Sequence, residues 1–393
     1  MTEAKKNILT LVIALLLSLI GIEFFLRMFD PTDFDMLTRI NEDGFVTHKT
    51  NVDRGRYDGE VKRKVHVKTN SLGFVGEEFI KEKNEGALRV AVLGDSFAQG
   101  IQIDYEKTYV YLLKNNLQSS LASNPSSSYK SAEVLNFGIG GMGTADEMKY
   151  YSKYASQYHP DVVVLSFYLG NDISDNGYYF EDREKLLSSS TADWDAVPQY
   201  GAVKGKDFLA LKDKIYRKLA IVRFMDKAVR TLPVLNNLAV TLGLFRPPVP
   251  VDEAGLNLPH WDYYYLDPLD SERAKHAAFS SELINNFRNE LEKDGVKLIV
   301  MLIPEGKTVN QDLLNAFKNN HPKLKDYVFN PVGMENKLIE GLNPGAAVLN
   351  LRGSLERQVL NHNEMYNSGI HHFSEKGHIV VSEELAKFIV SLP

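Results

Sequence analysis

The sequence predicts an α/β fold in which helices cover both faces of a parallel sheet, preceded by one apolar helix. From about residue 86 onward, short apolar runs alternate with longer segments of helical periodicity, which is typical of a parallel sheet with helical crossovers. Glycines directly follow the ends of several of these runs. A long apolar run also lies close to the N-terminus. Together these observations predict the fold class.

The N-terminal run extends from Ile8 to Ile22 and is preceded by Lys5 and Lys6. A bilayer needs about 20 apolar residues, and the run reaches that length only if Glu23 lies near the far headgroups. No good small-x-small cleavage site follows the run. We therefore expect residues 1–30 to form an uncleaved signal anchor, with a cleaved signal peptide or a buried or peripheral helix as alternatives. The lysines would stay cytoplasmic, which puts the remaining body outside the cytoplasmic membrane.

The next part of the chain leads into the first predicted strand. Residues 31–85 are polar and of mixed charge, and we expect a juxtamembrane segment that packs onto the main domain. Residues 88–93 are continuously apolar and partly β-branched, and Gly94 follows them. That pattern indicates a buried parallel strand. Residues 106–117 then have the spacing of a helix.

The same unit repeats further along the chain. Residues 134–137 form a short predicted strand, and Thr144 with Glu147 indicates a capping box at the start of the next helix. Residues 161–169 are strongly apolar and end at Gly170. Because functional sites in such sheets lie outside the carboxyl ends of the strands, the glycines that follow these strands mark the expected site.

The C-terminal third continues the pattern. A helix is predicted over residues 271–293, with strands over 296–303 and 346–351. The last helix begins after Ser374, a good N-cap. Its apolar residues follow helical spacing at Val381, Leu385, Phe388 and Leu392.

Between about residues 173 and 270 the alternation fails, and we expect a helical insertion that shapes or covers the site. It contains a cationic set that could face anionic lipid or simply solvent: Lys212, Lys214, Arg217, Lys218, Arg223, Lys227 and Arg230. It also contains an aromatic cluster that could stack on sugars or pack in the core or a lid: Trp261, Tyr263, Tyr264 and Tyr265.

Four short motifs at predicted strand ends carry the chemistry. They are Gly94-Asp95-Ser96, the glycine run Gly138–Gly143, Gly170-Asn171-Asp172, and His371-His372 ahead of Gly377. A serine hydroxyl at the start of a helix is exposed to nearby backbone amides, but it needs a base to become a good nucleophile. Backbone in the glycine run and an asparagine amide can donate to an oxyanion. The set describes a serine esterase site.

These blocks resemble the GDSL/SGNH hydrolase family, whose fold is a three-layer α/β/α sandwich. Gly94-Asp95-Ser96 matches the family's first block, which makes Ser96 the nucleophile and its amide an oxyanion donor. The segment 136–141 is similar to the glycine block and places a second donor at Gly141. The Gly-Asn-Asp block at 170–172 makes Asn171 the third donor.

The resemblance covers residues 86–393 apart from the insertion. It implies an esterase that uses an acyl-serine and no cofactor. The membrane segment and the stretch from Asn70 to Phe74 resemble an anchored bacterial branch linked to surface polysaccharide or lipid acyl chemistry. We therefore expect a single-pass protein of the cytoplasmic membrane, with its catalytic domain in the periplasm or at the cell surface.

The last block departs from the family pattern of Asp-x-x-His. Spacing to Gly377 favours His372 as the base, with His371 as the alternative, but Gly369 or Ser368 then stands where the acid belongs. Three accounts remain open: a backbone carbonyl orients a Ser–His dyad, Glu364 or another acid reaches the imidazole, or catalysis is weak or absent.

Composition narrows the function. The net charge of −6 argues against a nucleic-acid partner, which usually requires a basic face. The chain contains no cysteine, which excludes thiolate catalysis. A metal site built from His371, His372 and His378 lacks a supporting carboxylate cluster, and we expect none.

Three functional hypotheses follow. The first is a membrane-anchored esterase that cleaves an O-acyl ester of a glycan or a lipid. The second is an O-acyltransferase that modifies a cell-surface polysaccharide. The third is a catalytically impaired protein with a role in glycan binding or assembly.

Overall fold

The computed structural model describes residues 2–29, 39–40, 45–124, 127–190, 194, 219–221, 224–225, 258, 260–361, 364–367 and 372–392. The chain divides into two compact units. One unit comprises Met1–Met36 and Gly201–Glu253, and the other comprises Leu37–Tyr200 and Ala254–Pro393.

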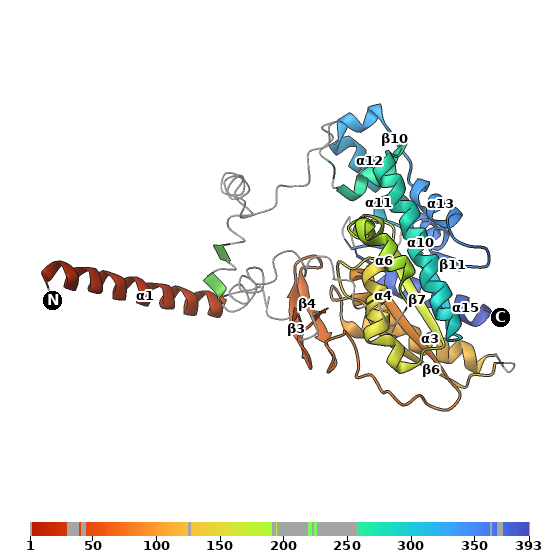
Figure 1. Cartoon of the computed structure of the whole chain (residues 1–393), viewed down its shortest axis with the longest axis horizontal. Helices are drawn as coiled ribbons and strands as arrows, with labels where there is room; N and C mark the ends of the chain where they lie inside the picture. The colour runs from red at the N-terminus through yellow and green to blue at the C-terminus, as the bar shows by residue number, and fades with distance from the viewer. Residues whose placement is uncertain are drawn as a thin grey trace. The chain divides into compact units, whose positions relative to one another are not determined.

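The first unit contains the N-terminal helix α1 (Glu3–Phe29), drawn in red in Figure 1. Its segment Lys5–Met28 is long and apolar enough to cross a membrane, a property that signal sequences share. Its apolar side chains are exposed along its length. Near its end, the carboxylate of Glu23 accepts the backbone N–H groups of Ala220 and Ile221, each at 2.9 Å.

The second unit is built on a five-stranded parallel sheet with the strand order β11-β9-β7-β5-β6. The strands are β5 (Ala87–Gly94), β6 (Ser131–Asn136), β7 (Val162–Tyr168), β9 (Lys297–Ile303) and β11 (Ala347–Asn350). Every residue of β5 and β7 is buried, because each strand has neighbours on both sides and helices on both faces. The predicted parallel sheet is confirmed.

Helices form the outer layers of a three-layer sandwich. Alternate residues of β5 face opposite sides, so that Val90 and Val92 pack in one core and Ala91 and Leu93 in the other. The first core includes residues of α3 (Tyr109–Ala122) and α15 (Glu375–Ser391). The second includes residues of α4 (Thr144–Lys153) and α10 (Ser271–Lys293). The expected α/β/α sandwich is confirmed.

Shorter elements connect and flank these layers. The remaining helices are α2 (Ser96–Gln99), α5 (Asp172–Gly177), α6 (Arg183–Ser188), α11 (Gly306–Val309), α12 (Gln311–Asn320), α13 (Gly333–Glu340) and α14 (Arg352–Leu360). The 3₁₀ segments are η2 (Tyr105–Lys107), η3 (Ala155–Tyr158), η4 (Phe180–Asp182), η6 (His260–Tyr265) and η7 (Pro322–Asp326). The minor strands are β1 (Arg39–Ile40), β2 (Val46–Thr47), β3 (Asp53–Asp58), β4 (Arg63–Lys68), β8 (Leu266–Asp267) and β10 (Val328–Phe329).

One local prediction is wrong. We expected Thr144 and Glu147 to form a capping box, but Gly143 occupies the N-cap position of α4 and no side chain caps it. Thr144 is already helical, and its hydroxyl accepts a hydrogen bond from Asn176 Nδ2 at 3.3 Å. The carboxylate of Glu147 is buried without a hydrogen-bond partner among the described residues.

Ahead of the sheet, the chain forms a feature that the sequence analysis did not predict. Strands β3 and β4 pair antiparallel as a hairpin, drawn in orange in Figure 1. The chain then returns to the domain, where Phe74 and Phe79 pack against Phe137 with ring centroids 5.1 and 4.8 Å apart. These aromatic contacts join the segment after the hairpin to the core beneath β6.

Much of the expected insertion lies outside the described residues, including all seven side chains of its cationic set. Of the aromatic cluster, Tyr263, Tyr264 and Tyr265 are buried, which fits packing in the core. The side chain of Trp261 is not among those described.

Candidate active site

Ser96 lies at the carboxyl end of the buried strand β5. The strand ends at Gly94, where an added Cβ would lie 2.7 Å from Ser166 Cβ and 2.9 Å from Ala98 Cβ. Asp95 caps α2, since its carboxylate accepts the N–H of Phe97 at 2.8 Å. Ser96 is therefore the first residue of α2.

His372 lies beside this serine. Its Nε2 is 2.9 Å from Ser96 Oγ, the distance of a hydrogen bond. The loop before α15 holds the ring in place through an antiparallel bridge between Tyr366 and Phe373. The ring also packs on Phe97, with centroids 5.3 Å apart. The structure thus brings Ser96 and His372 together, and the alternative base His371 lies outside the described residues.

A carboxylate contacts the other ring nitrogen of His372. Glu60 Oε2 is 2.7 Å from Nδ1, and Glu60 Oε1 accepts the backbone N–H of His372 at 3.3 Å. Glu60 lies in the turn of the β3–β4 hairpin, 312 residues away in the chain. Burial alone would raise the pKa of Glu60, but its hydrogen bonds and charge interaction with His372 outweigh burial and lower it.

Glu60 is not among the residues that the sequence motifs predicted for the site. Of the three accounts left open there, the geometry matches an acid other than Glu364, whose backbone carbonyl instead accepts from Ser374 Oγ. A signal for the hairpin was present: Asp58-Gly59 is a common turn pair, and Val65 and Val67 alternate with polar residues after it. No local pattern connects that turn with the last helix.

A cavity of about 250 Å³ opens over the serine. Its lining residues are Asp95, Ser96, Phe97, Tyr168, Gly170, Asn171 and His372. Asn171 Nδ2 donates one of its two hydrogens to Asp175 at 2.8 Å, which orients the amide and leaves the second hydrogen for a ligand.

The glycine run also reaches the neighbourhood of Ser96. At Gly140, an added Cβ would lie 3.5 Å from Ser96 Cβ. Gly141 has φ of +77°, a conformation that favours glycine, and a Cβ there would meet open space. Gly141 is not among the residues that line the cavity. Gly141 is exposed and lies next to Gly140 in the glycine run.

Buried carboxyl groups surround the site, and burial works against their ionisation. Burial raises the pKa of Asp95 to about 6 and that of Asp175 to about 7. It also raises the pKa of Asp172 and of Glu147 well above the usual range. At neutral pH, Asp95 is therefore still mostly ionised, Asp175 is only partly ionised, and burial opposes the ionisation of Asp172 and Glu147 more strongly.

The third histidine considered in the sequence belongs to the core. His378 is buried in α15, and its Nδ1 accepts the N–H of Tyr109 at 3.0 Å. Burial lowers the pKa of His378 to about 3, so the ring is neutral. Within the part of the chain that the structure describes, no group of three or more suitable side chains could hold a metal ion.

Several solved structures are similar to this chain. A two-domain esterase (CEX) active on acetylated mannans, co-crystallized with mannopentaose, is 11% identical with a TM-score of 0.36, and the match covers 78% of this chain and 49% of that one. An acetyl xylan esterase, AlAXEase, is 13% identical with a TM-score of 0.36, covering 76% of this chain and 98% of that one. A variant of Axe2, an acetyl xylan esterase from Geobacillus stearothermophilus, is 11% identical with a TM-score of 0.36, covering 79% and 97%.

The chain thus spans about half the length of the first of these structures. No curated protein matches it. The sequence model of the GDSL-like lipase/acylhydrolase family matches residues 90–385, which is most of the chain and includes the strands of the central sheet from Val90 onward. The chain therefore belongs to the GDSL-like lipase/acylhydrolase family.

Proposed function

We propose that this protein is a membrane-anchored esterase that removes an O-acyl group from a substrate outside the cytoplasm, with Ser96 as nucleophile and His372 as base. The observation that carries the proposal is the 2.9 Å contact between Ser96 Oγ and His372 Nε2 within a cavity that Asn171 also lines. Nucleophile, base and an amide donor then share one space, as acyl transfer requires.

The reaction follows from this geometry. His372 Nε2 takes the hydroxyl proton as Ser96 Oγ attacks the acyl carbon, and the carbonyl electron pair moves onto oxygen. The side-chain N–H of Asn171 and the backbone N–H groups of Ser96 and Gly141 stabilise this oxyanion. His372 then returns the proton to the departing alcohol. Water attacks the acyl-serine by the same route and releases the carboxylic acid.

The cavity favours a short acyl group. At about 250 Å³ it is smaller than the roughly 300–1,000 Å³ pockets that enclose drug-sized ligands. The rings of Phe97 and Tyr168 line it and lie 4.3 Å apart between centroids, which leaves a small apolar surface for a methyl group. An O-acetyl group on a glycan is therefore the preferred substrate, and a lipid ester is second.

Helix α1 supports the membrane part of the proposal. The surfaces of water-soluble proteins rarely expose a continuous row of apolar side chains as long as the one on α1. The lysines before it favour a cytoplasmic N-terminus and an extracytoplasmic catalytic domain. The hypothesis of a catalytically impaired protein was motivated by a missing acid, and Glu60 beside His372 removes that motivation.

Hydrolysis of aryl esters of increasing acyl length by the purified full chain tests the proposal. We expect turnover of the acetyl ester to exceed that of long-chain esters, and Ser96→Ala to lose about 10⁶-fold in kcat. Equal activity of Ser96→Ala and wild type would reject the mechanism. Acyl release that occurs only with an added acceptor glycan would favour the O-acyltransferase instead.

A further inference from the structure

The base of this site is contacted by a residue that lies outside the family-matched region. We propose that Glu60 supplies the carboxylate that orients His372, and that the β3–β4 hairpin delivers it to the site. The inference rests on the proposed function, because it assigns a positioning residue to the same serine–histidine pair. In this proposal, Glu60 takes the role of the carboxylate that the family pattern has three residues before the histidine, where this chain has Gly369.

The contact itself has the geometry that such a role requires. Glu60 accepts from both the ring Nδ1 and the backbone N–H of His372, so the carboxylate fixes the ring relative to its own main chain. With Nδ1–H donated to Glu60, Nε2 keeps its lone pair for the proton of Ser96. The Glu60 side chain is 27% exposed and that of His372 is 19% exposed, so solvent only partly screens the pair.

The hairpin turn holds Glu60 in position. Asp58 is buried, and its Oδ1 accepts the N–H groups of Glu60 at 2.9 Å and Val61 at 3.2 Å. Its Oδ2 pairs with Arg56 Nη1 at 3.0 Å, and the same nitrogen donates to the carbonyl of Ile101 at 3.4 Å. Asp58 thus closes the turn and links it to the loop after α2.

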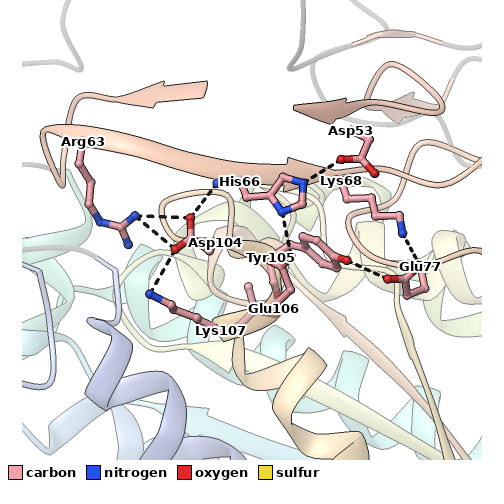
Figure 2. A network of polar contacts seen from close by, with 10 residues as sticks. Asp53, Arg63, His66, Lys68, Glu77, Asp104, Tyr105, Glu106 and Lys107 are labelled. Atoms are coloured by element: carbon pink, nitrogen blue, oxygen red, sulfur yellow. Dashed lines mark hydrogen bonds and ion pairs between the residues drawn. The ribbon is translucent and has the colours of Figure 1, made fainter. Parts of the chain in front are cut away.

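An ionic network attaches the rest of the hairpin to the domain, as Figure 2 shows. Next to the turn, Arg63 pairs with Glu375 at 2.6 Å and with Asp104 at 3.3 Å. Glu375 is the first residue of α15, so Arg63 connects the hairpin to the helix that immediately follows the His372 loop. The carboxylate of Asp104 also accepts the backbone N–H of His66 at 2.8 Å.

Further along β4, two more side chains join the network in Figure 2. The ring of His66 lies between Asp53 and Glu106, at 2.8 and 2.7 Å. Lys68 pairs with Glu77 at 2.5 Å. The hydrogen bond that the His66 ring donates to Asp53 is the largest of the effects that raise the pKa of His66. Attachments at the turn and along β4 therefore fix the position of Glu60 from two directions.

Removing the carboxylate gives the most direct test. In the full chain, we expect Glu60→Gln to lower kcat by about 10²–10⁴-fold with KM nearly unchanged, because orientation and charge of the imidazole matter in the transition state. The acid limb of the kcat/KM profile should move to lower pH, since a protonated His372 loses its neighbouring negative charge. Glu60→Ala should recover part of its kcat with added formate, which can occupy the vacated position.

Two further titratable groups near His372 also influence the pH profile. Among the described residues, Asp95, from the turn between β5 and α2, and His378, from α15, also interact electrostatically with His372. Both remain in every Glu60 variant, so the difference from wild type reports Glu60. Because the pKa of Glu60 is lowered, its carboxylate stays ionised where the histidine must act as a base.

Glu364→Gln is the matched control, because it removes an exposed carboxylate from the loop that leads to His372 and should leave kcat and the pH profile as in wild type. Thermal melting checks that each variant is folded. The inference would be overturned if folded Glu60→Gln kept the wild-type kcat and pH profile, or if formate did not restore activity to Glu60→Ala. If Ser96→Ala were inactive in the same assay, the proposed function would still stand. Activity in Ser96→Ala would reject the proposed function itself.

Discussion

Asn171 shows how a single side chain in this site is prepared for its task. Its amide donates one hydrogen to the carboxylate of Asp175, and burial raises the pKa of that acid to about 7. The partner consequently carries less charge than a surface carboxylate at neutral pH. The second amide hydrogen remains free to meet an oxyanion in the cavity over Ser96.

Replacing Asn171 with alanine should remove that donor. We expect kcat to fall by about 10²–10³-fold, with KM within a few-fold of wild type, because the donor contacts charge that exists only in the transition state. Steady-state kinetics on an acetyl ester measures this effect. A rise in KM at unchanged kcat would instead make Asn171 a substrate-binding residue.

The individual residues of the site also show which of them can be predicted from the sequence. Ser96 and Asn171 follow strand ends directly, and His372 precedes a recognisable helix start, so spacing along the chain was enough to select them. Glu60 makes its contact across 312 residues through the docking of a hairpin, and no periodicity in the chain records such a contact. Gly141 was selected from the glycine block, and its positive φ fits a turn conformation that favours glycine.

Among the elements, the long apolar strands were the easiest to predict and the hairpin the hardest. β7 and β9 are continuous apolar runs because they are buried on both faces. The strands of the hairpin contain many charged residues, and ionic contacts hold the hairpin to the domain in addition to the buried side chains of Val65 and Val67. Such contacts leave only a weak hydrophobic pattern in the sequence.

Helix α15 places a strict steric requirement on its first turn. An added Cβ at Gly377 would overlap the backbone carbonyl of Met365 and lie 3.1 Å from Phe373 Cβ. The carbonyl of Met365 also accepts the N–H of Ser374 at 2.9 Å, so the loop that carries His372 runs directly against the helix. Gly377 allows this close approach.

Gly377→Ala should therefore disturb the loop and the helix start together. We expect a loss of about 1–3 kcal/mol in the free energy of unfolding, because the obstacle is backbone rather than a flexible side chain. Urea unfolding measures the stability, and kcat should fall as His372 moves away from Ser96. The control is Gly295→Ala, which changes a glycine after α10 where an added Cβ would meet no other atom. Its φ of +72° means that this substitution also costs stability, but kcat should be retained. Unchanged kcat in both variants would contradict the account.

At the scale of the whole molecule, a catalytic unit is combined with an apolar helix. The hairpin and most of the family-matched region lie in one compact unit, while α1 and residues 201–253 belong to the other. The sequence predicted both the sandwich and the apolar helix from composition and periodicity. Low apolar periodicity across residues 173–270 gave only a general expectation of helices, and most of that segment lies outside the described residues.

Helix α1 should retain the full chain in the membrane. We expect the protein to remain in the pellet after alkaline carbonate extraction, and a C-terminal alkaline phosphatase fusion to be active, because the flanking lysines favour a cytoplasmic N-terminus. Release into the carbonate supernatant, or an inactive but stable fusion, would contradict the anchored, extracytoplasmic arrangement.

The most direct measurement of the central claim is covalent labelling of the full chain with a fluorophosphonate, followed by mass spectrometry of the intact protein and its peptides. The account predicts one adduct on wild type, located on Ser96, and no adduct on Ser96→Ala. A folded wild-type protein that stays unlabelled while hydrolysing esters, or an adduct that persists in Ser96→Ala, would contradict it.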